Sequence, residues 1–139
     1  MLLLDDDYEY LRSCGLDHAE DEKLRYFVFK GFPLPTGMYA SAGALLETAD
    51  VLVRIPQNYN TTGTDMLWVH PPLARADGKA IPAAHGPGQG DASQFDGKEF
   101  CRWSRHYTAE SWKTGVDGVS KIISRIDWAL RNPDADRRS

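Results

Sequence analysis

The spacing of apolar and polar positions predicts a helix near the start of the chain, over residues 5–13. Leu4, Tyr8 and Leu11 fall on one helical face, as expected of a helix that packs on a core. The aspartates that open this stretch suit the positive end of a helix, and Gly15 is a natural stop. The segment is therefore predicted to be a short amphipathic helix.

Three stretches have the composition or the alternation of strands. Residues 24–32 are rich in aromatic and β-favouring side chains, residues 49–56 alternate apolar and polar positions, and residues 66–69 form a short apolar run. The connections between them are of hairpin length, so an antiparallel meander is expected. Residues 33–37 and 57–64 are expected to be turns, and residues 38–48 either a weak strand or a loop.

A second amphipathic helix, of about four turns, is expected near the end of the chain. Apolar residues recur there with helical period, at Val116, Val119, Ile122, Ile123, Ile126 and Leu130. Thr114 and Asp117 match a capping pattern, in which a hydroxyl is followed three residues later by an acid. Asn132-Pro133 should end the helix, and residues 134–139 are expected to be a frayed polar tail.

The segment from Met66 to Trp112 lies between these parts, and after its first four residues it is expected to be a long irregular loop. Long loops inside small domains are more often functional than decorative. The predicted fold class is α+β: an N-terminal helix, an antiparallel meander of three or four strands, a long active-site loop and a C-terminal helix packed on the sheet. The 139 residues are expected to form a single domain, 1–139.

The composition is that of an ordinary globular protein, with 42% hydrophobic and 26% charged residues. No apolar run approaches the roughly 18 residues that cross a membrane. Two cysteines far apart in sequence fit a cytoplasmic protein. Charge is uneven, with a net charge of −6 over residues 1–50 and +3 over residues 98–139. This distribution argues against general nucleic-acid binding and suits different partners at the two ends.

The end of the central segment carries the most reactive set of side chains. Cys101 is followed by Arg102, Arg105 and His106, and nearby cations favour the thiolate that a nucleophilic cysteine needs. The alternative is a buried structural cysteine between aromatic neighbours. A zinc site made by Cys101 and histidines would have no compact ligand spacing, so neither a metal nor a cofactor is expected.

The ordered set of motifs resembles the ubiquitin-conjugating enzyme fold. Residues 55–59 resemble that family's proline-tyrosine turn, Val69-His70-Pro71 the start of its His-Pro-Asn motif, residues 97–101 its glycine-to-catalytic-cysteine segment, and Trp112 its downstream tryptophan. Four stretches resemble a bacterial branch, the prokaryotic ubiquitin-conjugating-like family encoded beside ubiquitin-like proteins and their activating enzymes: Gly31-Phe32-Pro33-Leu34-Pro35, His70-Pro71-Pro72-Leu73, Arg102-Trp103-Ser104-Arg105-His106 and Trp112-Lys113-Thr114-Gly115-Val116-Asp117. Together the matches span nearly the whole chain.

The resemblance implies an enzyme that carries the C-terminus of a bacterial ubiquitin-like protein as a thioester on Cys101 and transfers it to a nucleophile. The resemblance also assigns His70 a bracing role. From its place near Cys101, His106 is predicted to be the oxyanion donor or base for transfer, and the alternative is a partly exposed loop histidine. The expected partners are the ubiquitin-like protein and its activating enzyme. Contacts with partners are assigned to Asp5, Asp6, Asp7, Arg102, Trp103 and Arg105.

Two departures from the family pattern leave a second function open. Pro72 stands where the motif has asparagine, and His70 and Cys101 are 31 positions apart, which implies an expanded loop. The alternative function is a catalytically inactive binding module of the same fold, which positions a ubiquitin-like protein or its activating enzyme.

Overall fold

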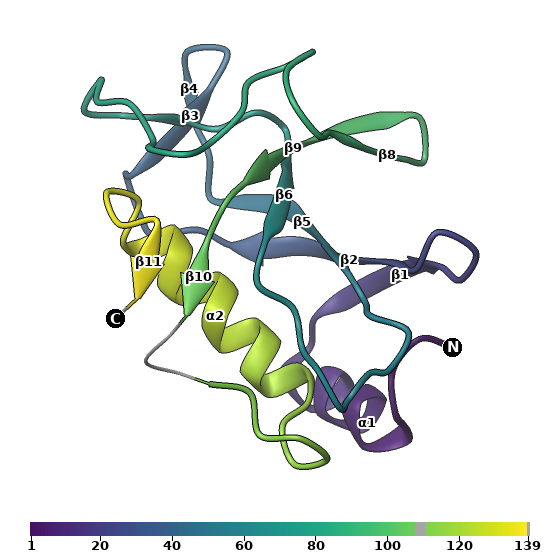
Figure 1. The fold of residues 1–139 in the computed structure, drawn as a ribbon. Helices are drawn as coiled ribbons and strands as arrows, with labels where there is room; N and C mark the ends of the chain where they lie inside the picture. Colours follow the sequence, from purple (N-terminus) through teal and green to yellow (C-terminus); the bar gives the residue numbers. More distant parts are fainter. Residues whose placement is uncertain (108–110, 139) are drawn as a thin grey trace.

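The structure is a computed structural model that describes residues 1–107 and 111–138. In chain order the elements are α1 (Asp5–Cys14), β1 (Asp17–Asp21), β2 (Tyr26–Pro33), β3 (Tyr39–Ser41), β4 (Ala44–Leu45), β5 (Thr48–Arg54), β6 (Leu67–His70), β7 (Ala74–Arg75), β8 (Ser93–Phe95), β9 (Lys98–Trp103), β10 (His106–Tyr107), α2 (Val119–Arg131) and β11 (Arg137–Arg138). The main sheet has the order β1-β2-β5-β6-β9-β8, and every neighbouring pair is antiparallel (Figure 1). A smaller sheet has the order β4-β3-β7, and β10 pairs with β11 in parallel. The architecture is α+β, as predicted.

Both helices pack on one face of the main sheet and form the principal core with it. Their contributions to this core are Tyr8, Leu11, Val119, Ile122, Ile126, Ala129 and Leu130. The strands contribute Phe27, Phe29, Val51, Val53, Leu67, Val69 and Trp103. A helix with one apolar face must bury it against another element, and here that element is the sheet.

The opposite face of the sheet carries a second and smaller apolar cluster. It consists of Val28, Leu52, Trp68 and Phe100, which alternate along their strands with residues of the principal core because successive side chains point to opposite faces. The central strands are therefore covered on both sides. This explains why residues 66–69 form a continuous apolar run in the sequence instead of an alternating one.

Asp7 ties α1 to the first turn of α2. Its Oδ1 accepts a hydrogen bond from the backbone N of Val119 at 2.9 Å, and its Oδ2 accepts one from the Tyr59 hydroxyl at 2.7 Å. A carboxylate is favoured at this end of a helix, where unpaired N–H groups carry partial positive charge. Gly118 makes room for it, since a Cβ at that position would lie 2.4 Å from Oδ1. The N-terminus of α2 is thus capped by a side chain from another helix.

Several predictions of elements are confirmed. The helix over 5–13 is α1, and Gly15 follows it in the left-handed conformation with φ 69°. The three predicted strands are β2, β5 and β6, with ends shifted by one or two residues. Residues 38–48 contain β3 and β4, which favours the strand alternative for that stretch. The second helix ends at Arg131, before Asn132-Pro133 as expected.

The predicted start of the second helix was wrong. The helix begins at Val119, and its N-cap residue is Gly118, not Thr114. Asp117 instead accepts a hydrogen bond from the Lys113 backbone N at 2.8 Å, and Val116 is 77% exposed. The local capping pattern is outcompeted because Asp7 supplies a carboxylate to α2 from outside its own sequence.

The sheet and the central segment also differ from the prediction. The main sheet has six strands instead of three or four, because the acidic edge strand β1 and the hairpin of β8 and β9 were not predicted. Residues 93–103, expected as part of a long active-site loop, are mostly strand. The tail is not simply frayed, since Arg137–Arg138 pairs with β10 and Asp134 forms an ion pair with Arg75. The pairing of the tail with β10 and of β9 with β6 is non-local and leaves little periodic signal in the sequence. β1 with β2 and β8 with β9 instead form hairpins with short turns, and Asp96-Gly97 between β8 and β9 is a local turn signal that the prediction missed.

The contacts of Asp7 predict a large effect of its removal. We expect Asp7→Ala to lower the free energy of unfolding by about 2–3 kcal/mol, since it removes the cap of α2 and leaves the Tyr59 hydroxyl without its acceptor. The neighbouring Asp6 is exposed, so Asp6→Ala is a matched control, for which a change within about 0.5 kcal/mol is expected. Urea denaturation followed by circular dichroism measures both. Equal stabilities of the two variants would contradict the assigned role of Asp7.

Candidate functional site

The candidate site is built around β9, which lies between β6 and β8 in the main sheet. Cys101 pairs with Val69 and Trp103 pairs with Leu67. Paired residues point to the same face of a sheet, so Cys101 shares the helix-covered face with Val69 and Trp103. Arg102 points to the opposite face.

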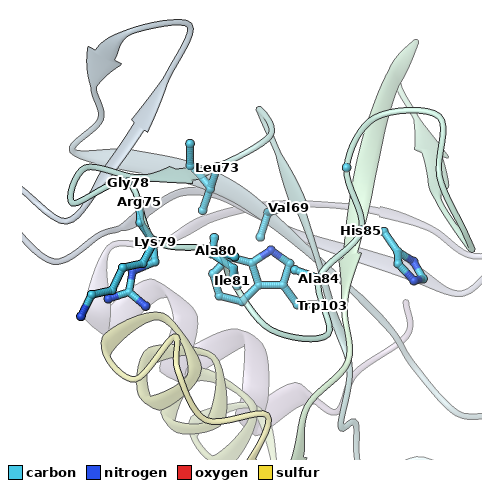
Figure 2. A pocket seen from close by; sticks show the side chains of 12 residues that line it. Val69, Leu73, Arg75, Gly78, Lys79, Ala80, Ile81, Ala84, His85 and Trp103 are labelled. Atoms are coloured by element: carbon cyan, nitrogen blue, oxygen red, sulfur yellow. The ribbon is translucent and has the colours of Figure 1, made fainter.

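A cleft of about 380 Å³ opens beside this face (Figure 2). Val69 and Trp103 from the sheet line it together with residues from the connection between β6 and β9, namely Leu73, Ala74, Arg75, Gly78, Lys79, Ala80, Ile81, Ala84, His85 and Gly86. Figure 2 shows the Trp103 ring beside Ile81 and Ala84, with Arg75 and Lys79 at one end and His85 at the other. The cleft therefore has an apolar middle and cationic or imidazole groups at its ends. Cys101 is not among its lining residues, although its partner Val69 and its neighbour on that face Trp103 both are.

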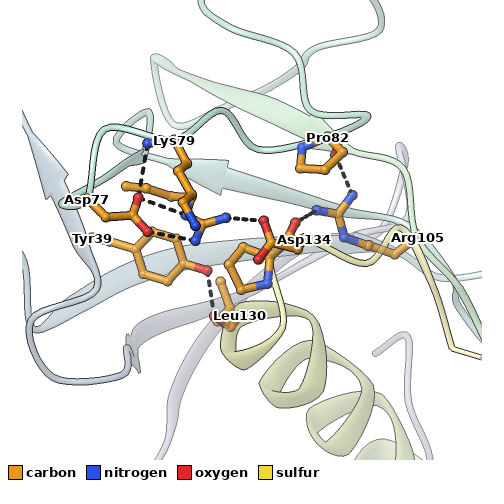
Figure 3. Close-up of polar contacts among 9 residues, drawn as sticks. Tyr39, Asp77, Lys79, Pro82, Arg105, Leu130 and Asp134 are labelled. Carbon is orange, nitrogen blue, oxygen red and sulfur yellow. Dashed lines mark hydrogen bonds and ion pairs between the residues drawn. The ribbon is translucent and has the colours of Figure 1, made fainter.

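Two arginines brace the connection between β6 and β9 against the end of α2 (Figure 3). Arg75 forms ion pairs with Asp77, at 2.8 Å, and with Asp134, just beyond α2. Arg105 donates to the carbonyl oxygens of Pro82 at 3.0 Å and Pro133 at 3.3 Å. One wall of the cleft is in this way fixed to the residues that directly follow α2.

The position of Arg105 contradicts the expectation that it contacts a partner. It is fully buried, with an exposure of 0%. Its guanidinium also donates to the Ser104 carbonyl at 2.7 Å and lies 4.9 Å from the centre of the Trp103 ring. Burial lowers the pKa of Arg105 below its ordinary value. Arg105 is therefore a structural cation under the cleft, and its carbonyl partners, the aromatic ring and the charge of Asp136 partly compensate its desolvation.

Cys101 is the residue on which the sequence-based function depends, and its thiol is buried, with 2% of the residue exposed. Burial, with a smaller contribution from the charge of Glu99, raises the pKa of Cys101. The expectation that Arg102 and Arg105 favour its thiolate was wrong. Arg102 lies on the other face of the sheet and pairs with Asp91 at 3.5 Å, and Arg105 is held by carbonyls. The alternation of side chains along a strand separates groups that are neighbours in sequence.

His70 makes the kind of bracing contact expected of it. Its Nδ1 lies 3.1 Å from the Glu99 carbonyl oxygen, and because a carbonyl can only accept, this nitrogen carries the proton. The ring also packs against Phe100 at a centroid distance of 5.5 Å. These contacts connect the end of β6 to the hairpin of β8 and β9, next to Cys101.

His106 lies on β10, where its backbone N donates to the Asp136 carbonyl at 3.0 Å. The chain between Cys101 and His106 runs through β9 into β10 (Figure 1). At about 3.3 Å per extended residue, the five positions span at most roughly 16 Å. The role of His106 in transfer stays a prediction without a supporting contact.

The remaining predicted site residues fall into two groups. Trp103 is 2% exposed and lines the cleft, so it contributes to its shape more than to an outer surface. Asp5 and Asp6 are exposed on α1. Asp7 is buried at the α1–α2 contact, so its assignment to a partner surface was wrong. The hydrogen bonds to Tyr59 and Val119 occupy its carboxylate.

The sequence prediction missed the cleft itself. Leu73, Ile81 and Ala84 lie in a stretch rich in alanine and proline, and all three pack partly against the principal core. Such residues in a long connection are a signal that it folds onto the domain. Within residues 1–107 and 111–138, His, Cys, Asp and Glu form no group of three or more placed to hold a metal ion. In the same residues neither helix has the length and apolar character to span a membrane.

The family described as Prokaryotic E2 family E matches the chain over residues 3–133. This range includes both helices, the main sheet and the cleft. No curated protein and no solved structure matches the chain.

The burial of Cys101 predicts very different reactivities of the two thiols. At neutral pH we expect Ellman's reagent to react with Cys14, which is exposed, at least about tenfold faster than with Cys101, because reaction of a buried thiol needs local opening and ionisation. The variants Cys14→Ser and Cys101→Ser assign the fast and the slow phase, and denaturant should make both thiols react fast. A fast phase that is lost in Cys101→Ser would show that the thiol is open in solution.

Proposed function

Because the chain belongs to Prokaryotic E2 family E, we propose that this conjugating-enzyme-like protein carries the C-terminus of a ubiquitin-like protein as a thioester on Cys101. The ubiquitin-like protein would arrive from an activating enzyme and leave to a nucleophile. The observation that carries the proposal is the place of Cys101 on β9. Its pairing partner Val69 and its neighbour on the same face, Trp103, both line the cleft. Cys14 lies at the end of α1, in a separate groove with Ile123 and Arg131.

The cleft has the features needed to hold an extended protein tail. Its middle is apolar, with Leu73, Ile81 and Trp103, and aliphatic side chains of a tail can bury surface there. Lys79, at one end, is exposed and can attract carboxylates of the partner. Arg75 is less available for this, because Asp77 and Asp134 already pair with it.

The chemistry consists of two acyl transfers. In the first, the Cys101 thiolate attacks the thioester that links the tail to the activating enzyme; a new C–S bond forms and the thiolate of the activating enzyme leaves. In the second, an amine attacks the carbonyl carbon, the Cys101 thiolate leaves, and a base takes the proton of the amine. Both steps build negative charge on the carbonyl oxygen. Pro72 has no side-chain donor for that charge, and His106 would have to reach the carbonyl oxygen from β10.

A second candidate function is non-covalent. The resting thiol is 2% exposed, and burial raises the pKa of Cys101, which is the opposite of what activates a nucleophilic cysteine. This observation favours a binding module that holds the tail or the activating enzyme without forming a bond. The thioester mechanism requires a movement that exposes Cys101, whereas the binding module does not.

Formation of a thioester distinguishes the two functions. The protein is incubated with the activating enzyme, the ubiquitin-like protein and ATP, and adducts are separated on a gel without reducing agent. We expect Cys14→Ala to form an adduct that thiols cleave and Cys101→Ala to form none. If no variant forms an adduct and Cys101→Ala still binds the ubiquitin-like protein, the result supports the binding module and contradicts the thioester mechanism. An adduct that only Cys14→Ala loses would contradict both the site and the mechanism.

The acidic surface of α1 is proposed to attract the activating enzyme. Asp5 and Asp6 are exposed there and residues 1–50 have a net charge of −6, so association with a basic surface should be fast and sensitive to salt. We expect the double variant Asp5→Lys, Asp6→Lys to slow association roughly three- to tenfold at low salt, with little effect at high salt. Asp7 stays unchanged because of its structural role.

The association rate is measured directly, by stopped-flow fluorescence, so that it does not depend on thioester formation. Glu47→Lys serves as a control, because Glu47 is exposed outside α1. Equal slowing by Glu47→Lys would indicate a general effect of net charge, and parental rates in the double variant would remove α1 as the docking surface.

A further inference from the structure

We propose that residues 82–91, here called the strap, cover Cys101 in the resting protein and that Asp91 is the positioning residue that holds the strap closed. The proposal deepens the proposed function, on which it rests for its biological meaning. It predicts how accessible the Cys101 thiol is in the free protein, and this accessibility can be measured without any partner.

The strap runs along the edge of β9 on both sides of Cys101. The Ser104 backbone N donates to the Ala83 carbonyl at 2.9 Å, and the His85 backbone N donates to the Arg102 carbonyl at 2.8 Å. Ala84 forms an isolated bridge with Trp103. The strap thus continues the sheet at the end of β9 that β8 leaves unpaired, since β8 pairs only with residues 98–100.

Further along, the strap contacts the side chain of Glu99. The Gly88 backbone N donates to Glu99 Oε1 at 3.1 Å. Glu99 lies two positions from Cys101 and so on the same face, and its charge acts on the Cys101 thiol. Between His85 and Gly88 the strap therefore passes the level of Cys101. A partner that approaches the thiol from this edge of the sheet meets the strap first.

The strap then crosses to the other face of the sheet, where Asp91 holds it. The Asp91 carbonyl accepts from Trp68 Nε1 at 2.7 Å, and its carboxylate accepts two hydrogen bonds from Arg54 at 3.0 Å. Arg102 approaches the same carboxylate at 3.5 Å. The Arg54 guanidinium lies over the Trp68 ring, 4.2 Å from its centre. The residue after Cys101 thus helps to hold the strap through its side chain.

The strap is built to open without unfolding the domain. Residues 87–91 are exposed, so polar contacts hold this half of the strap more than buried apolar surface does. The side chains of Arg54 and Asp91 are 36% and 46% exposed, and ion pairs this open contribute little to stability. Gly90 allows a close turn, because a Cβ there would lie 2.0 Å from His85 Nδ1. Segments that are held by exposed polar contacts, with little buried apolar surface, typically open locally.

Release of the strap would expose the buried Cys101 thiol, as the proposed carrier function requires. With the strap away from β9, the Cys101 thiol gains solvent and the edge of the strand becomes free for an extended tail. An activating enzyme or a ubiquitin-like protein that binds Asp91 or its arginines would then favour the open state, because it stabilises that state more than the closed one.

The test uses the full chain with Cys14→Ser, in which Cys101 is the one remaining cysteine. Asp91→Asn removes the charge of the contact and leaves the carbonyl that Trp68 uses. We expect the rate of Cys101 labelling by Ellman's reagent to rise about two- to fivefold, as loss of an exposed charge pair should allow. Asp127→Asn is the matched control: Asp127 also binds an arginine, Arg131, and its side chain is 45% exposed. That variant should label at the parental rate.

Hydrogen exchange separates local release from general destabilisation. Asp91→Asn should speed exchange of the His85 and Ser104 amides, which join the strap to β9, and leave the amides of the β2–β5 pairing unchanged. Parental labelling in Asp91→Asn, equal acceleration in Asp127→Asn, or faster exchange throughout the sheet would each overturn the proposal. Faster labelling in a variant that still forms no thioester adduct would support the strap and contradict the proposed carrier function.

Discussion

The pairing of β9 with β6 in the interior of the main sheet is the constraint on which the candidate site depends. It fixes Cys101 opposite Val69 and Trp103 opposite Leu67, and it assigns each side chain of β9 to one of two covered faces. Trp103 becomes part of the cleft wall, Arg102 joins the charged cluster on the far face, and Cys101 is buried on the helix-covered face. Reaction of the thiol with a partner therefore requires that the thiol first become exposed.

Two buried charges fix α2 at its ends and with it the frame of the site. The Asp7 carboxylate caps the N-terminus of α2 through the Val119 amide. Arg105 binds the Pro133 carbonyl just beyond the C-terminus, and the Tyr39 hydroxyl donates to the Leu130 carbonyl. The signs of both charges agree with the dipole of the helix. Because Arg105 also binds the Pro82 carbonyl, the position of α2 and the wall of the cleft are linked.

Membership of Prokaryotic E2 family E and the burial of Cys101 lead to one question about mechanism. A carrier must expose its thiol, while a binding module can keep it covered. The proposed strap would connect these states. Two backbone hydrogen bonds and the contact of Gly88 with Glu99 attach it to β9, Arg105 holds the Pro82 carbonyl, and an exposed ion pair and the Trp68 hydrogen bond hold Asp91 on the far face. The cost of opening such a segment is small compared with that of unfolding the sheet.

The sequence by itself determined the α+β class, α1 and its stop at Gly15, the strands β2, β5 and β6, the end of α2, and the family resemblance. These features follow from local periodicity, from capping residues and from the order of motifs along the chain. Only the tertiary structure decided that β9 lies inside the main sheet, that Arg105 and Asp7 are internal, and that Thr114 does not cap α2. Partners distant in sequence determine these features. Asp7 lies 112 positions from the Val119 amide that it caps, and β9 pairs with β6 more than thirty positions away. The hairpin of β8 and β9, with its short Asp96-Gly97 turn, is a local signal that the sequence prediction missed. Side chains that are adjacent in sequence, such as Cys101 and Arg102, are then separated by the sheet itself, and for that reason the predicted cluster around the thiol does not form.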